Sequence, residues 1–155
     1  MKFDHCKVET NNLNKKPVII LLGDLARLHF SQVHTLLAQI GVYRGQPPIL
    51  YILCKKDGVM QKEIADSLNL TPATITDTLQ RMEKARLLER RTDPEDGRIS
   101  RVYITEKGKE VKKQVDDIIK NIDEETFKGL TVEEKQLFRQ LVLRMITNLT
   151  QASTK

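Results

Sequence analysis

The chain has 155 residues, of which 39% are hydrophobic and 30% are charged, and its formal net charge is +5. This composition excludes a chain that is disordered throughout, and no apolar stretch approaches the roughly 20 residues of a membrane-spanning helix. Two cysteines, Cys6 and Cys54, are too few for a disulfide framework, and their surroundings match no structural zinc spacing. The N-terminus carries no apolar secretory segment. We therefore expect a cytoplasmic protein with no membrane partner, no metal and no cofactor.

The first half of the chain predicts four helices. Apolar residues recur at three- and four-residue steps over 17–40, which predicts a long helix buried on more than one side. A second helix is expected over 46–56 and a short third helix over 61–68. The fourth begins at Thr71-Pro72, because a threonine hydroxyl can cap the helix and proline is tolerated at its first position.

After the fourth helix, the spacing of apolar residues changes from that of helices to that of strands. Residues 87–91 and 101–104 predict two short strands, and residues 93–98 between them supply the Pro, Asp and Gly of a turn. Two more helices follow, one with a stripe from Val111 to Ile122 and one opened by a capping box at 131–134. The predicted fold class is mainly α with a small β-hairpin (α+β).

A short helix followed at once by a capped helix is the helix-turn-helix arrangement, in which the second helix enters the major groove of DNA. With Ile75, Leu79 and Met82 in the core, the opposite face of that helix is free to approach base edges. Asp77 on this face has two possible roles: accepting a hydrogen bond from cytosine, or holding Arg81 one turn later. The predicted DNA-binding residues of the helices are Gln61, Thr71, Ala73, Thr74, Thr76, Asp77, Gln80 and Arg81.

The hairpin predicts a second contact with DNA. A guanidinium at the tip can enter a narrow, electronegative minor groove, which favours Arg98 for this role. Asp93 and Asp96 are then explained as turn residues that cap backbone N–H groups and orient Arg98. The predicted DNA-binding residues of the hairpin are Arg90, Arg91, Arg98 and Arg101.

These segments resemble the MarR family of winged helix-turn-helix regulators. The matching sequences are QKEIADSL (61–68), TPATIT (71–76), LQRMEK (79–84), LERR (88–91), DPEDGR (93–98) and ITEKG (104–108). The resemblance implies one domain over 1–155, with a DNA-binding region over about 46–107 and dimerisation helices over about 17–40 and 108–150. It also implies a homodimer that binds a pseudo-palindromic operator on double-stranded DNA. Where relatives commonly have glycine after the recognition helix, this chain has Arg86.

Relatives often respond to a small phenolic or hydrophobic effector, and the resemblance makes Phe30, His34, Tyr51 and Arg86 the candidates to bind one. In the alternative interpretation Phe30 and Tyr51 are ordinary core aromatics. Some relatives sense peroxide through a cysteine near the N-terminus, which suggests Cys6, whereas Cys54 is predicted to be buried. The leading hypothesis is a ligand-responsive repressor; the alternatives are a redox-sensing regulator and a protein-interaction module. An enzyme is disfavoured, because the chain has no nucleophile elbow, P-loop or HExxH motif.

Overall fold

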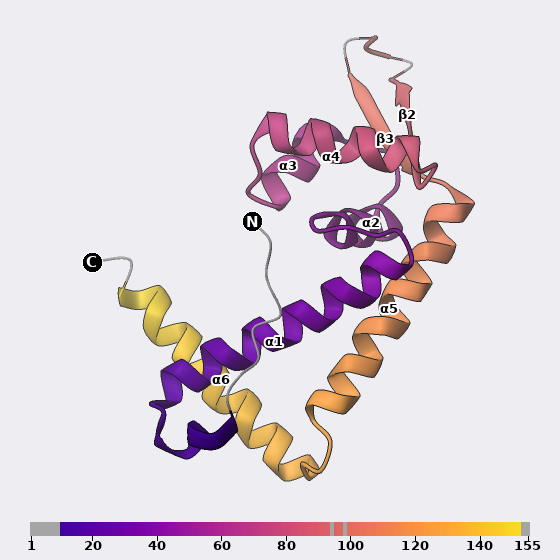
Figure 1. Cartoon of the computed structure of the whole chain (residues 1–155). Helices are drawn as coiled ribbons and strands as arrows, with labels where there is room; N and C mark the ends of the chain where they lie inside the picture. Colours follow the sequence, from indigo (N-terminus) through magenta and orange to yellow (C-terminus); the bar gives the residue numbers. More distant parts are fainter. Residues whose placement is uncertain (1–9, 94, 98, 153–155) are drawn as a thin grey trace. The chain divides into compact units, whose positions relative to one another are not determined.

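The computed structural model describes residues 10–93, 95–97 and 99–152 (Figure 1). Its elements are the 3-10 helix η1 (Thr10–Lys15), α1 (Val18–Gln39), α2 (Gln46–Lys55), β1 (Val59–Met60), α3 (Gln61–Ser67), α4 (Pro72–Lys84), β2 (Leu88–Thr92), β3 (Ser100–Ile104), α5 (Glu106–Thr126) and α6 (Val132–Ala152). The predicted fold class, mainly helical with a small antiparallel sheet, is confirmed. The chain forms two compact units, and their boundary lies within α5, between Lys120 and Asn121. The single domain predicted over 1–155 stays a prediction.

The core of the first unit lies where α2, α3 and α4 meet the sheet. Ile75, Leu79 and Met82 are all completely buried, which confirms the predicted inner face of α4. Ile64 of α3 is buried with them. Asn69, in the tight turn between the two helices, has φ of 51°, the left-handed geometry that asparagine tolerates.

The sheet has three strands in the order β1-β3-β2, all antiparallel. β2 and β3 form the predicted hairpin, with Leu88 opposite Ile104 and Thr92 opposite Ser100. β1 was not predicted, because a strand of two residues is too short to show the alternation of apolar and polar residues. Its pairing places Val59 opposite Val102 and brings the turn at Gly58 against the ring of Tyr103.

Two predictions about burial are wrong for the single chain. Over α1 only Val33 and Leu37 are buried, although burial on more than one side was expected. Half-buried side chains include Leu21, Leu22 and Leu36, and the exposed apolar side chains include Val18, Ile19, Ile20, Leu25, Leu28 and Phe30. Cys54 is exposed rather than buried. The reason is the phase of α2, whose inward face presents Gln46, Ile49, Leu50 and Leu53.

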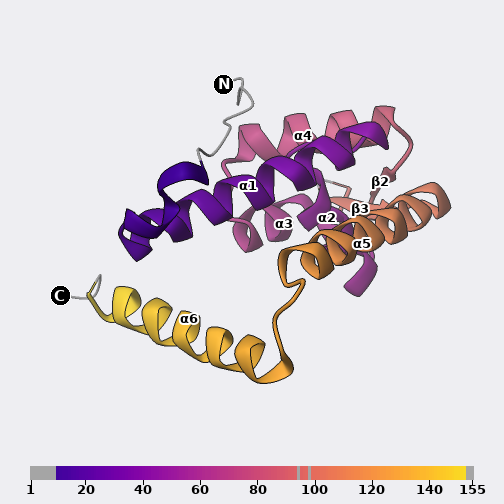
Figure 2. The ribbon, with the colours of Figure 1, turned by 60° about the horizontal axis from the view of Figure 1, so that its bottom comes forward.

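The second unit contains the end of α5 and all of α6. The predicted capping box is confirmed: the Thr131 amide donates to Glu134 Oε2 at 2.8 Å, and the Glu134 amide donates to Thr131 Oγ1 at 3.2 Å. Phe127 and Phe138 meet edge to face, with ring centroids 6.1 Å apart. α6 is a long continuous helix (Figure 2), and it buries none of its side chains in the described chain.

Within the described ranges, no helix combines the length and the apolar character needed to cross a bilayer.

Candidate nucleic-acid interface

The start of α4 is built as the sequence predicted. Thr71 has an extended backbone, and its Oγ1 accepts a hydrogen bond from the Thr74 amide at 3.2 Å. Pro72 occupies the first helical position, where the backbone N–H would have no partner inside the helix, so the lack of an N–H in proline costs nothing. The Thr71 and Thr74 hydroxyls are also 2.9 Å apart, so the helix begins with two exposed, mutually bonded hydroxyl groups.

The outer face of α4 is exposed along its length. Six of the residues predicted to bind DNA are exposed here: Thr71, Ala73, Thr74, Asp77, Gln80 and Arg81. Arg81 Nε donates to the backbone carbonyl of Asp77 at 3.2 Å. In the described chain it is this carbonyl, not the Asp77 carboxylate, that holds Arg81. The small hydroxyl-bearing residues at the start of the helix leave room for a close approach to base edges.

Gln61 and Thr76 link α3 to α4. Gln61 Nε2 donates to Thr76 Oγ1 at 2.7 Å, and the same hydroxyl donates to the Pro72 carbonyl, also at 2.7 Å. Both side chains are half-buried, unlike the exposed face of α4. These bonds give both residues a role in orienting α4, in addition to the DNA contact predicted for them.

Arg90 joins the hairpin to α4. Its Nε and Nη2 both donate to Glu83 Oε2, the first at 3.0 Å. The hydrogen bond from Arg90 holds the pKa of Glu83 below its usual value. Sequence reasoning missed Glu83, because nothing in the local pattern pairs a residue at the end of α4 with one on β2.

Arg101 joins the hairpin to the turn before β1. Its Nε donates to Asp93 Oδ2, and its Nη1 donates to the Gly58 carbonyl at 3.1 Å. Asp93 is buried, and its Oδ1 also accepts the amides of Glu95 at 2.9 Å and Asp96 at 3.2 Å. The bond to Arg101, followed by these amides, lowers the pKa of Asp93. Asp93 therefore caps the turn as predicted, but the arginine it holds in the described chain is Arg101. Arg98 lies outside the described residues.

Arg91 is exposed on β2. Its guanidinium carbon is 4.5 Å from the centroid of the Tyr103 ring, and Nη2 pairs with the Glu89 carboxylate. Exposed ion pairs of this kind contribute little to stability, so a phosphate group can replace Glu89 at small cost. Of the three arginines described in the hairpin, Arg91 has the most exposed side chain.

The four candidate effector residues come from different elements. Phe30 is 60% exposed on α1 and His34 is half-buried on the same helix. Tyr51 is 51% exposed on α2, with the Lys55 and Lys112 ammonium groups 4.4 and 5.7 Å from its ring centroid. Arg86 is exposed after α4. The alternative that Phe30 and Tyr51 are core aromatics is wrong for the single chain.

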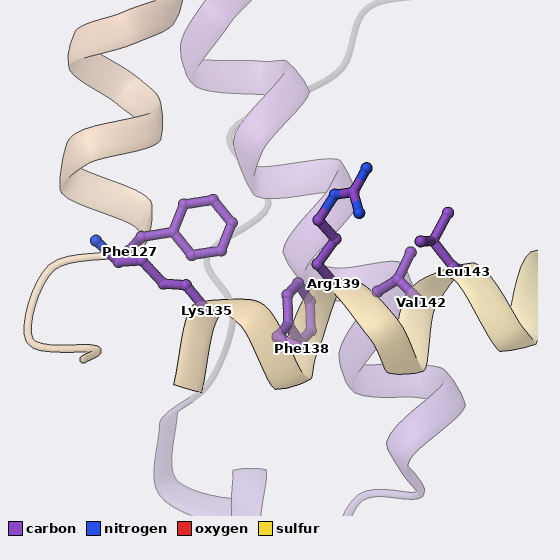
Figure 3. A pocket seen from close by; sticks show the side chains of 6 residues that line it. All are labelled: Phe127, Lys135, Phe138, Arg139, Val142 and Leu143. Atoms are coloured by element: carbon purple, nitrogen blue, oxygen red, sulfur yellow. The ribbon is translucent and has the colours of Figure 1, made fainter. Parts of the chain in front are cut away.

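Sequence reasoning did not find a cavity of about 360 Å³ in the second unit (Figure 3). Phe127, in the turn just after α5, and five side chains of α6 line it: Lys135, Phe138, Arg139, Val142 and Leu143. Cys6 lies outside the described residues, so redox sensing stays a prediction. Among the residues that the structure describes, no group of three or more His, Cys, Asp or Glu side chains is arranged to hold a metal ion.

Comparison with known proteins agrees with the helix-turn-helix and hairpin described above. The sequence profile of the MarR family matches residues 42–100, from the segment before α2 to the first residue of β3. The transcriptional regulator HosA of Escherichia coli O111:H- is 33% identical over 103 residues, which are 66% of this chain and 76% of HosA. The HTH-type transcriptional repressor IacR of Pseudomonas putida is 29% identical over 128 residues, 81% of this chain and 77% of IacR.

The crystal structure of MarR superposes with a TM-score of 0.71 at 25% sequence identity, and the match covers 88% of this chain and 93% of that one. The profile, the relatives and the fold agree on one assignment. The chain belongs to the MarR family of winged helix-turn-helix transcriptional regulators.

Proposed function

We propose that this regulator acts in the cytoplasm as a homodimeric repressor that places its two α4 helices in the major groove of a pseudo-palindromic operator. The observation that carries the proposal is the division of α4 into two faces. One face is completely buried at Ile75, Leu79 and Met82, and the other presents exposed hydroxyl, amide and guanidinium groups. A helix fixed on one side by its core and polar on the other is suited to direct contact with bases.

Exposed apolar side chains on the terminal helices support the dimer. On α1, Val18 is 71% exposed and Ile19 is 70% exposed. On α6, Leu149 is 70% exposed, and Leu137 and Ile146 are each 56% exposed. Leaving such surface in water costs about 25 cal/mol for each Å². A second copy of the chain would cover it, and a closed two-fold pair uses the same surface on both subunits.

We propose that a small phenolic or hydrophobic effector, bound beside Phe30, His34, Tyr51 and Arg86, controls DNA binding. The surroundings of Tyr51 favour an aromatic ligand, because the Tyr51 ring lies beside the ammonium groups of Lys55 and Lys112. A phenolate would gain from both the aromatic surface and the two positive charges.

The dimer is tested by sedimentation of the full chain and of a chain that ends at Thr131. The full chain should sediment as a dimer, and the shortened chain as a monomer or an aggregate. Leu149→Asp, which adds one charge to the exposed side of α6, should weaken the dimer without removing the helix. A shortened chain that remains a soluble dimer would contradict the assignment of the interface to α6.

DNA recognition is tested by selecting duplexes from a random library and titrating variants against the selected operator and against unrelated DNA. Thr74→Ala and Gln80→Ala should lose about 1–3 kcal/mol on the operator and much less on unrelated DNA. Arg98→Ala should weaken both and reduce the salt dependence by about one phosphate contact. Gln114→Ala, an exposed glutamine on α5, is the matched control.

A selected site without two-fold symmetry would contradict the dimeric docking. If no sequence is selected at all, the protein-interaction module becomes the better explanation of the fold.

A further inference from the structure

The turn between α4 and β2 presents three successive backbone carbonyls to the beginning of α5. Lys107 Nζ donates to the Ala85 carbonyl at 2.8 Å, and Thr105 Oγ1 donates to the Arg86 carbonyl at 2.7 Å. The Thr105 amide donates to the Leu87 carbonyl at 3.2 Å. We call residues 85–87 and 105–108 the α4–α5 junction. All of it belongs to the first unit.

The Thr105 hydroxyl makes a second bond within the junction. It accepts the Gly108 amide at 3.0 Å while it donates to the Arg86 carbonyl. One hydroxyl group therefore satisfies an amide at the start of α5 and a carbonyl in the turn after α4. The first amides of a helix have no partner inside it, so a side chain that bonds both such an amide and this turn fixes the start of α5 to the turn.

Two further features make the junction tight. A Cβ atom at Gly108 would lie 2.0 Å from the Leu87 carbonyl oxygen, so only glycine allows this approach of the two backbones. Arg86 has φ of 59°, a conformation that a non-glycine residue retains only when its surroundings hold it there. In addition, the Lys107 ammonium lies at the negative end of the α4 dipole, where a cation is favoured.

We propose that Thr105 and Lys107 are positioning residues that set the angle between α4 and α5, and thereby the separation of half-sites that the dimer accepts. The inference rests on the proposed dimeric DNA binding. Glu83 and Arg90 tie α4 to β2, and the junction joins the turn between them to the start of α5. Neither Thr105 nor Lys107 needs to touch DNA for this role.

The test uses full-length protein and duplexes that carry two copies of the half-site selected by the wild type. Their centre-to-centre separation is changed in steps of one base pair around one helical turn, roughly 10 bp. Thr105→Val removes both hydroxyl bonds at nearly constant volume, and Thr105→Ser retains the hydroxyl. The measured quantity is the ratio of affinities for the best separation and for its neighbours.

Thr105→Val should reduce this ratio by about threefold to tenfold, the equivalent of one to two hydrogen bonds. Thr105→Ser should keep the wild-type ratio. Lys107→Met should also reduce it, whereas Lys113→Met, at an exposed lysine further along α5, should not. Lys107 is exposed, so its variant decides the question if Thr105→Val does not fold.

Folded Thr105→Val and Lys107→Met proteins with the wild-type ratio would overturn the role of the junction and leave the proposed function intact. A wild-type protein that prefers no separation, or that binds a single half-site with full affinity, would instead refute the dimeric docking on which the inference depends.

Discussion

We expect Gly108→Ala to destabilise the protein, although replacing glycine by alanine usually stabilises a helix. In a helix interior alanine is favoured over glycine by about 1 kcal/mol. At Gly108 the added Cβ would lie 2.0 Å from the Leu87 carbonyl oxygen and 2.7 Å from Ile104 Cγ1. The nearest atom belongs to the backbone and cannot rotate away. Either α5 or the turn after α4 must therefore shift.

The magnitude follows from these two opposing effects. Forcing an extra carbon into a well-packed region costs about 1–3 kcal/mol, and a backbone contact this short favours the upper end. After subtraction of the helix-propensity gain, we expect a net loss of about 2 kcal/mol. For a chain of this size that corresponds to a fall in Tm of about 4–8 °C.

Thermal denaturation followed by circular dichroism measures this loss, with the protein concentration held constant because the proposed dimer would make Tm depend on it. Gly97→Ala is the control, since nothing lies within 4 Å of a Cβ placed there, and its effect should stay within about 0.5 kcal/mol. A Gly108→Ala protein as stable as the wild type, or more stable, would refute the close approach of Leu87 and α5.

Three further predictions concern single residues. Arg86→Gly should raise the free energy of unfolding by about 0.5–1 kcal/mol in denaturant titrations, because it relieves a left-handed φ, and Asn69→Gly should change it less. The lowered pKa of Asp93 means that its ion pair with Arg101 stabilises the folded state above the ordinary carboxyl value of 3.8 and is lost as pH falls through the lowered value. Acid denaturation of Asp93→Asn should therefore depend less steeply on pH below about 4; identical curves would count against the pairing. Thr71→Ala should cost about 1 kcal/mol through the loss of the helix cap, and Thr71→Ser should recover most of it.

Local features were predicted well because each depends on residues close in sequence. Thr71 and Pro72 mark the start of α4, and the three- and four-residue spacing of Ile75, Leu79 and Met82 defines its buried face. The capping box at the start of α6 is equally local. In each case the interacting groups lie within two turns of the same helix, so their spacing along the chain is also their spacing in space.

Burial could not be predicted in the same way. The pattern over α1 predicted a helix correctly, but most of its apolar side chains have no cover within the described chain. A hydrophobic pattern shows that a surface is apolar, and it does not show whether the same chain or a second copy covers it. Cys54 was misplaced for a related reason, because its neighbours in sequence are apolar while its position on α2 faces outward.

The sequence alone therefore determined the helices, the hairpin, the face of α4 that is free to meet DNA, and the resemblance to the family. Only the tertiary structure decided which partners Arg90 and Arg101 take. Arg101 reaches the Gly58 carbonyl across 43 positions, and Arg90 reaches Glu83 from another element. The connection of α4 to α5 depends likewise on Thr105 meeting the Arg86 carbonyl, 19 positions away. Such contacts depend on strand register and on the close approach of two backbones, and no local period in a sequence encodes either of these.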